Sequence, residues 1–251
     1  MAVGTLILAV PLGVAAGAYV AEFPNSFWAR TIGFFSDTLV GVPSIVLGYA
    51  GYVILVQALG WSFSAAAACV TLAIMCLPYI CRSTELAFAA NSADLRESVY
   101  AVGANERQAM LLVLLPAATP GVLTGILLAL AISVGETAPL LYTAGFTNAY
   151  PSLSLIGNHQ NSHPVGYLTY AAYSLIEDPS PVIRALAYDA SLLLILLVLI
   201  LIIASRVIVR LSQKYSPNRA VGSLSRQDRR KARDLAAGRI TEEVAAGRAR
   251  D

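Results

Sequence analysis

The stretch from Glu97 to Pro116, ESVYAVGANERQAMLLVLLP, is a polar and charged segment in a chain that is otherwise mostly apolar. Within it, Gly103 is expected to end a first helix, because glycine accepts the left-handed conformation that a helix C-terminus needs. Asn105 and Gln108 have the spacing of a capping box and predict the start of a second helix. The sequence therefore predicts helix, tight turn, helix: a short rigid knob rather than a pocket.

The limits of this hairpin follow from capping and from proline positions. Asp94 and Glu97 have capping-box spacing, so the first helix is expected to begin at Leu95. Pro116 and Pro120 are expected to break the helical pattern before the next apolar run. The hairpin would then stand as a separate unit between two apolar segments.

The composition indicates a membrane protein. Of the 251 residues, 57% are hydrophobic and 13% are charged, whereas soluble domains carry roughly 25% charged residues. A membrane span needs about 20 mostly apolar residues. Five stretches meet this requirement, at about 2–21, 39–59, 64–81, 119–143 and 186–209. The third is short and could extend backwards to Trp61. We therefore expect an all-α polytopic bundle of about five spans.

Basic residues predict the orientation of these spans. Of the 17 Lys and Arg residues, 12 lie from Arg206 onward, and short cytoplasmic loops are rich in such residues. The hairpin and the tail at 211–251 are therefore expected in the cytoplasm, together with residues 22–38, and Met1 outside. The tail is either a solvated end or a segment that leans on anionic lipid headgroups. The clustering does not indicate nucleic-acid binding.

Two pairs of glycines predict close helix contacts. Gly13 with Gly17, and Gly121 with Gly125, have the small-xxx-small spacing that lets helix backbones approach each other.

Cysteine and histidine do not indicate a metal site. The three cysteines lie in one apolar segment, where buried free thiols are expected. They are Cys69, Cys76 and Cys81. His159 and His163 stand four apart in the long segment 144–185, but a site needs further ligands. That segment is either a docking surface for another protein or a solvated linker.

Two charged residues are candidates for a transport pathway. Glu136 lies inside the predicted fourth span, and a carboxylate at membrane depth usually faces a cavity or a partner. It is interpreted as a pathway residue, the alternative being a local hydrogen bond near a helix break. Arg82 ends the predicted third span. Its guanidinium suits an oxyanion, but its position also suits a cytoplasmic anchor.

The hairpin resembles the cytoplasmic coupling motif of ABC importer permeases. That motif reads Glu-Ala-Ala, three residues, Gly, nine residues, Ile, any residue, Leu-Pro. The matching positions here are Glu97, Ser98, Val99, Gly103, Val113, Leu115 and Pro116. Ser98, Val99 and Val113 are mild departures. The resemblance implies that the hairpin docks into a cleft on a separate ATPase subunit; the alternative is a generic helical hairpin.

Three further phrases resemble the phosphate-specific ABC importer permeases, the PstA-type subunit especially. They are GVPSIVLGYAGY at 41–52, CRSTE at 81–85 and GETAPLL at 135–141. The resemblance runs from Met1 to about Arg210. It implies a type I ABC importer permease fold at 1–210, with coupling helices at about 94–115 and the tail at 211–251 outside it. It also groups Thr137 with Glu136 and Arg82 on the translocation pathway.

The same resemblance implies the setting in which the chain works. It implies a bacterial inner membrane, a PstC-type permease partner, a pair of ATPase subunits and an extracytoplasmic phosphate-binding protein. The sequence contains no G-x-x-x-x-G-K-S/T motif, so ATP and Mg are expected on the ATPase partner and no cofactor on this chain. Alternatives are a permease for molybdate or sulfate, or a membrane sensory or scaffold subunit that does not transport.

Two departures from the family bear on these alternatives. Many relatives have an arginine four residues before the glutamate of Gly-Glu-Thr, where this chain has Ile132. The family also has six spans, so either a first helix precedes the stretch given or this is a five-helix permease.

Overall fold

The computed structural model of the protein describes residues 1–91, 93–147 and 163–214, which contain helices and no strands. The chain divides into two compact units, Met1–Arg210 and Leu211–Asp251. The expectations for the tail beyond 214, for His159 and for the middle of segment 144–185 lie outside the described residues.

The apolar helices agree with the predicted fold class. Four are long and apolar enough to cross a membrane: α1 (Ala2–Glu22), α4 (Ala65–Ala89), the run Glu106–Gly135, and Pro181–Ile208 within α10 (Pro181–Lys214). A bent pair can serve as a fifth span. The all-α membrane architecture is therefore confirmed, with four or five spans among the described residues.

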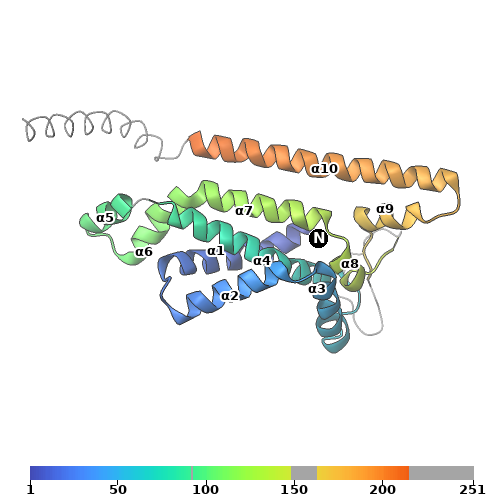
Figure 1. The fold of residues 1–251 in the computed structure, drawn as a ribbon, viewed down its shortest axis with the longest axis horizontal. Coiled ribbons are helices and arrows are strands. Elements are labelled where there is room, and N and C mark those ends of the chain that lie inside the picture. Colours follow the sequence, from blue (N-terminus) through green and yellow to red (C-terminus); the bar gives the residue numbers. More distant parts are fainter. Residues whose placement is uncertain (92, 148–162, 215–251) are drawn as a thin grey trace, which may run out of the picture. The chain divides into compact units, whose positions relative to one another are not determined.

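Helix α4 is the centre of this bundle and packs against α1 and α7 (Leu115–Gly135) (Figure 1). Helix α1 runs parallel to α4, with Gly4 beside Cys69 and Gly13 beside Ile80. A Cβ on Gly17 would meet the Thr84 side chain at 2.7 Å. The predicted close contact of α1 is thus confirmed, because only glycine fits there.

A neighbouring face of α4 is in close contact with α7, which runs antiparallel to it. A Cβ on Gly121 would collide with Ala87, and one on Gly125 with Ser83. The Ser83 hydroxyl donates a hydrogen bond to the Gly121 carbonyl at 2.9 Å. The second small-xxx-small prediction is therefore also confirmed.

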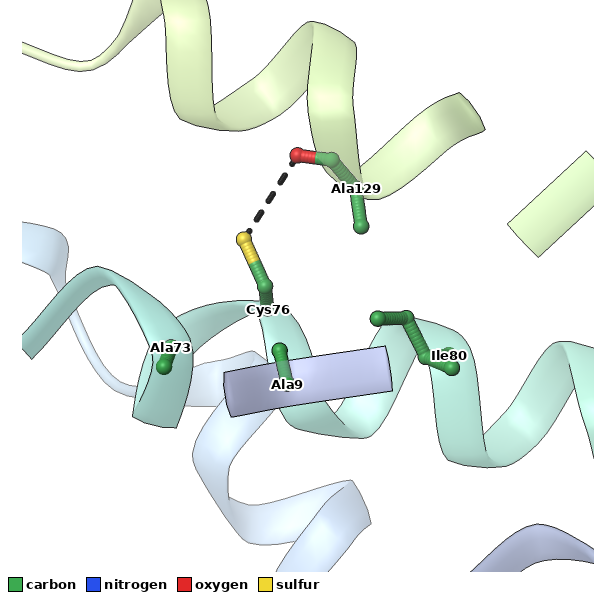
Figure 2. Close-up of a cluster of buried hydrophobic side chains, with 5 residues drawn as sticks. All are labelled: Ala9, Ala73, Cys76, Ile80 and Ala129. Carbon is green, nitrogen blue, oxygen red and sulfur yellow. Dashed lines mark hydrogen bonds between the residues drawn. The ribbon is translucent and has the colours of Figure 1, made fainter. Parts of the chain in front are cut away.

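The three helices meet in a core of mostly small side chains, shown in Figure 2. The members of this cluster are Ala9, Ala73, Cys76, Ile80 and Ala129. The Cys76 thiol donates to the Ala129 carbonyl at 3.5 Å. Cys76 and Cys81 are buried and Cys69 is half-buried, and all three are free, which agrees with the predicted free thiols.

The second predicted span differs from the observed structure. In place of one segment at 39–59, α2 (Phe27–Gly41) is followed by α3 (Ser44–Gly51) and the π-helix η1 (Tyr52–Ala58), with a bend of 107°. Val42 has an extended backbone (φ −76°, ψ 128°), since a residue before proline avoids the helical region.

The limits of the third and fourth spans were also predicted wrongly. Helix α4 extends forward to Ala89 rather than backward towards Trp61, so Arg82 lies within it. The fourth span runs from Glu106 to Gly135 instead of 119–143. Glu136 therefore follows a span and is not inside one.

Candidate functional sites: a helical hairpin and a pair of helix breaks

The hairpin begins with α5 (Ala93–Ala101). Asp94 lies inside this helix, so it is not the predicted N-cap. At the other end, the Gly103 N–H donates to the Tyr100 carbonyl at 3.0 Å and the Ala104 N–H to the Val99 carbonyl at 3.4 Å. These two bonds form a Schellman motif around Gly103, whose φ is +81°. The predicted glycine stop is confirmed.

The second arm begins with α6 (Glu106–Gln108). The Gln108 N–H donates to the Asn105 side chain at 2.9 Å, and the Asn105 N–H donates to the Gln108 side chain at 3.1 Å. The predicted capping box is therefore present. On both sides of the turn, backbone groups at the helix ends are hydrogen-bonded to nearby residues. The turn therefore has a defined conformation.

The second arm does not end at the prolines, contrary to the prediction. Helix α6 continues through the π-helix η2 (Ala109–Leu114) into α7, with Pro116 in its first turn and Pro120 inside it. The wider π turns accommodate the first proline ring. The Asn91 side chain donates to the Leu114 carbonyl at 3.2 Å, which joins the segment after α4 to this run of helix.

The base of the hairpin is packed into the bundle. Phe88, Leu114 and Ala118 are buried with Ala18 of α1, and Leu95 packs against them. The hairpin therefore joins α1, α4 and α7 at one end of the bundle, opposite α8 (Figure 1).

The coupling-motif residues divide between two faces. Glu97, Ser98, Gly103 and Pro116 are exposed, Leu115 is half-buried and Val99 is buried. At the tip, the side chain of Val102 is 83% exposed. The outward face thus combines a carboxylate with an apolar tip, and Val99 anchors the hairpin from within.

A second candidate site lies where two helices break. Glu136 follows α7 with an extended backbone (φ −74°, ψ 137°), before α8 (Ala138–Thr143). Its carboxylate is hydrogen-bonded by Ser44, the first residue of α3. The Thr169 hydroxyl of α9 (Leu168–Ile176) donates to the Glu136 carbonyl at 3.2 Å.

The backbones at these two breaks are in close contact. A Cβ on Gly48 would lie 2.7 Å from the Cα of Pro139, so α3 and α8 touch without intervening side chains. The sequence interpretation missed Ser44 and Thr169. Ser44 follows Pro43 in the GVPS segment at 41–44, and that proline indicates a helix break. No sequence pattern around Thr169 indicates its contact with Glu136.

Arg82 is not joined to Glu136 by any described interaction. Its guanidinium pairs with Glu85 at 2.7 Å on the exposed face of α4. Cys76 of α4 packs against Ala129 of α7, and Arg82 is six residues further along α4. A helix rises about 1.5 Å per residue, so this offset is about 9 Å towards the hairpin. Thr137 is half-buried before α8.

One pocket beside α3 does not suit an anion. A cavity of about 230 Å³ lies between α3, η1 and α4, and its lining is apolar apart from Thr71. Within residues 1–91, 93–147 and 163–214, no group of three potential metal ligands occurs.

Comparison with known proteins identifies the family. Residues 9–216 match the family described as binding-protein-dependent transport system inner membrane component. The chain belongs to this permease family. The hairpin lies within the matched residues.

Several relatives carry the printed name phosphate transport system permease protein PstA. The PstA 2 protein of Mycobacterium bovis is 41% identical over 85% of this permease and 69% of its own length. The probable PstA of Methanocaldococcus jannaschii is 35% identical over 81% and 73%. The PstA of Yersinia pestis is 36% identical over 80% and 66%. The predicted PstA-type resemblance is confirmed.

Solved structures agree with the fold. The inward-facing MetNI methionine ABC transporter matches 84% of this permease and 88% of its own chain, with a TM-score of 0.65 and 23% identity. An amino acid ABC transporter matches 85% and 90%, with a TM-score of 0.56 and 17% identity. At these identities the likeness concerns the fold of the importer permeases alone.

Proposed function

We propose that this chain is the transmembrane permease subunit of an ATP-driven phosphate importer. The observation that carries the proposal is its relationship to permeases named for phosphate transport, at 35–41% identity over at least 80% of the chain. A binding-protein-dependent permease fold with an exposed helical hairpin supports this function.

In this proposal, the hairpin couples ATP use to transport. Glu97, Ser98, Gly103 and Pro116 dock on an ATPase subunit, and Leu115 carries the contact towards α7. Val99 keeps α5 fixed to the bundle. Because the second arm and α7 are one run of helix, displacement of the docked knob would move the whole of that run.

The partners follow from the same proposal. A PstC-type permease completes the membrane pathway, and a pair of ATPase subunits binds ATP and Mg. A phosphate-binding protein delivers the ion from outside the bacterial inner membrane. The hairpin and the segment 211–251 then face the cytoplasm, and the apolar outer faces of the helices contact lipid. This chain binds no cofactor of its own.

Glu136 is proposed to gate the pathway rather than to bind phosphate. Like charges repel at close range, and more strongly where water is scarce, so the carboxylate would oppose an anion beside it. Its bond to Ser44 instead ties α7 to α3 at their breaks. Thr137 belongs to the same break, and Arg82 would meet phosphate nearer the hairpin.

Uptake of labelled phosphate tests the proposal in a strain that lacks this subunit. The chain should restore uptake, and excess unlabelled sulfate or molybdate should not reduce it. Inhibition by either competitor would indicate another oxyanion. No uptake, with the chain in the membrane and bound to its ATPase, would favour the sensory or scaffold role, for which Ile132→Arg is then the decisive variant.

Glu136→Gln tests the gate. The amide keeps an acceptor for Ser44 but loses the charge, so we expect phosphate uptake to fall while the amount of assembled importer stays constant. Unchanged uptake kinetics would make Glu136 a local structural group.

A further inference from the structure

An ion pair links the hairpin to the first helix of the bundle. The Arg96 Nη1 lies 2.9 Å from the Glu22 Oε2. Arg96 belongs to α5, and Glu22 is the last residue of α1. The Glu22 side chain is 10% exposed and the Arg96 side chain 28% exposed. The contact is thus largely shielded and joins segments more than 70 residues apart in sequence.

The position of Glu22 makes this pairing important for α1. A carboxylate at a helix C-terminus faces the negative end of the helix dipole, so a nearby cation stabilises it. Exposed ion pairs contribute little, but removing one partner of a shielded pair leaves a charge without compensation. The end of α1 is therefore expected to follow Arg96 when α5 moves.

The turn after Glu22 can carry this motion into α2. The Tyr19 and Ser26 hydroxyls are hydrogen-bonded at 3.0 Å across the turn. The Phe23 N–H donates to the Tyr19 carbonyl, and the Ser26 N–H to the Phe23 carbonyl, each at 2.9 Å. Helix α2 then leads to the break before Ser44, which hydrogen-bonds Glu136.

We propose that the Arg96–Glu22 ion pair is a second transmission contact of the coupling hairpin, which moves α1 and α2 in step with α7. The proposal rests on the proposed function as an ATP-driven permease. In this proposal Arg96 and Glu22 are positioning residues that act on the helices behind the hairpin. The apolar packing of Leu95 and Val99 holds α5 in place, and the ion pair links α5 to α1.

The test uses the importer reconstituted in proteoliposomes with its ATPase, its permease partner and its binding protein. The readout is phosphate imported per ATP hydrolysed, because a loss of assembly would lower both quantities together and leave their ratio unchanged. Arg96→Glu and Glu22→Arg should each lower the ratio about fivefold or more, within the usual range of coupling between sites. The double variant restores opposite charges and should recover most of it.

Two further variants serve as controls. Arg96→Lys keeps the charge and should retain most of the ratio. Arg30→Glu makes the same charge change on the exposed part of α2, near the same end of the bundle, and should leave the ratio unchanged. Single variants with the wild-type ratio, or a double variant no better than the singles, would overturn the proposal.

A cross-linking measurement keeps the proposal separate from the identity of the cargo. Glu22→Cys and Arg96→Cys are combined in a background without the native cysteines and joined by a short bifunctional thiol reagent. If the two residues move together, the linked importer should retain ATP hydrolysis stimulated by its binding protein. Loss of stimulation on linking would overturn the proposal. Failure of the wild-type importer to take up phosphate would instead refute the proposed cargo.

Discussion

Replacement of Gly103 by valine is expected to uncouple ATP hydrolysis from transport. Gly103 has φ +81°, and a Cβ placed on it would have no neighbouring atom within 4 Å. The variant therefore introduces no collision, and its whole effect comes from the backbone conformation. The left-handed turn would have to relax, which would change the angle between the two arms that we propose dock on the ATPase.

The size of the effect follows from the backbone alone. A residue with a Cβ loses roughly 1–2 kcal/mol in the left-handed region, which lowers the population of the native turn about 5- to 30-fold relative to competing conformations. The cost for valine is expected at the upper end of this range because valine is β-branched. Asparagine adopts the left-handed region more readily. Gly103→Asn should therefore have a clearly smaller effect than Gly103→Val.

Phosphate imported per ATP in proteoliposomes measures the outcome. We expect the ratio to fall in the order glycine, asparagine, valine, while the amount of assembled importer stays constant. Gly33→Val is the matched control, since Gly33 lies in α2 and its added Cβ also meets nothing within 4 Å. Equal ratios for the two Gly103 variants and the control would refute the role assigned to this turn.

Three other changes test neighbouring parts of the structure. Gly17→Ala should lower the free energy of unfolding, measured by SDS titration, by about 1–3 kcal/mol because its Cβ collides with α4; Gly33→Ala, in open space, should not lower it. Asn105→Ala should speed hydrogen exchange at the Gln108 amide, as expected for the loss of a cap worth about 0.5–2 kcal/mol, and Asn105→Asp should preserve protection. Ser44→Ala should reduce phosphate uptake without reducing assembly, and wild-type uptake would show that its hydrogen bond is dispensable.

Local signals predicted the turn of the hairpin correctly, but not its outer limits. The capping box of Asn105 and Gln108 and the glycine stop at Gly103 depend on residues within five positions of each other. Such bonds form wherever the chain makes that turn, so the sequence is sufficient to predict them. The glycine pairs of α1 and α7 were predictable for a similar reason, because small residues one turn apart create a flat helix face.

Features that depend on distant partners could not be predicted in this way. The residues after Glu136 are apolar, so a hydropathy window continues past it, whereas the structure ends the span at Gly135. Pro116 and Pro120 would break an isolated helix. They are tolerated here next to the π-helix η2, which is not visible in the local pattern.

The two arms of the hairpin are connected to the two residues of one contact, Glu136 and Ser44. From Asn105, the run Glu106–Gly135 is 30 residues long, or about 45 Å of helix, and ends directly before Glu136. From Arg96, the path crosses to Glu22, turns into α2 and reaches the break before Ser44. Movement of one arm alone would pull the Glu136–Ser44 hydrogen bond apart, and movement of both together would carry it as a unit. If the hairpin couples ATP use to transport as proposed, its rigidity at Gly103 determines whether the two helix breaks move together or separate.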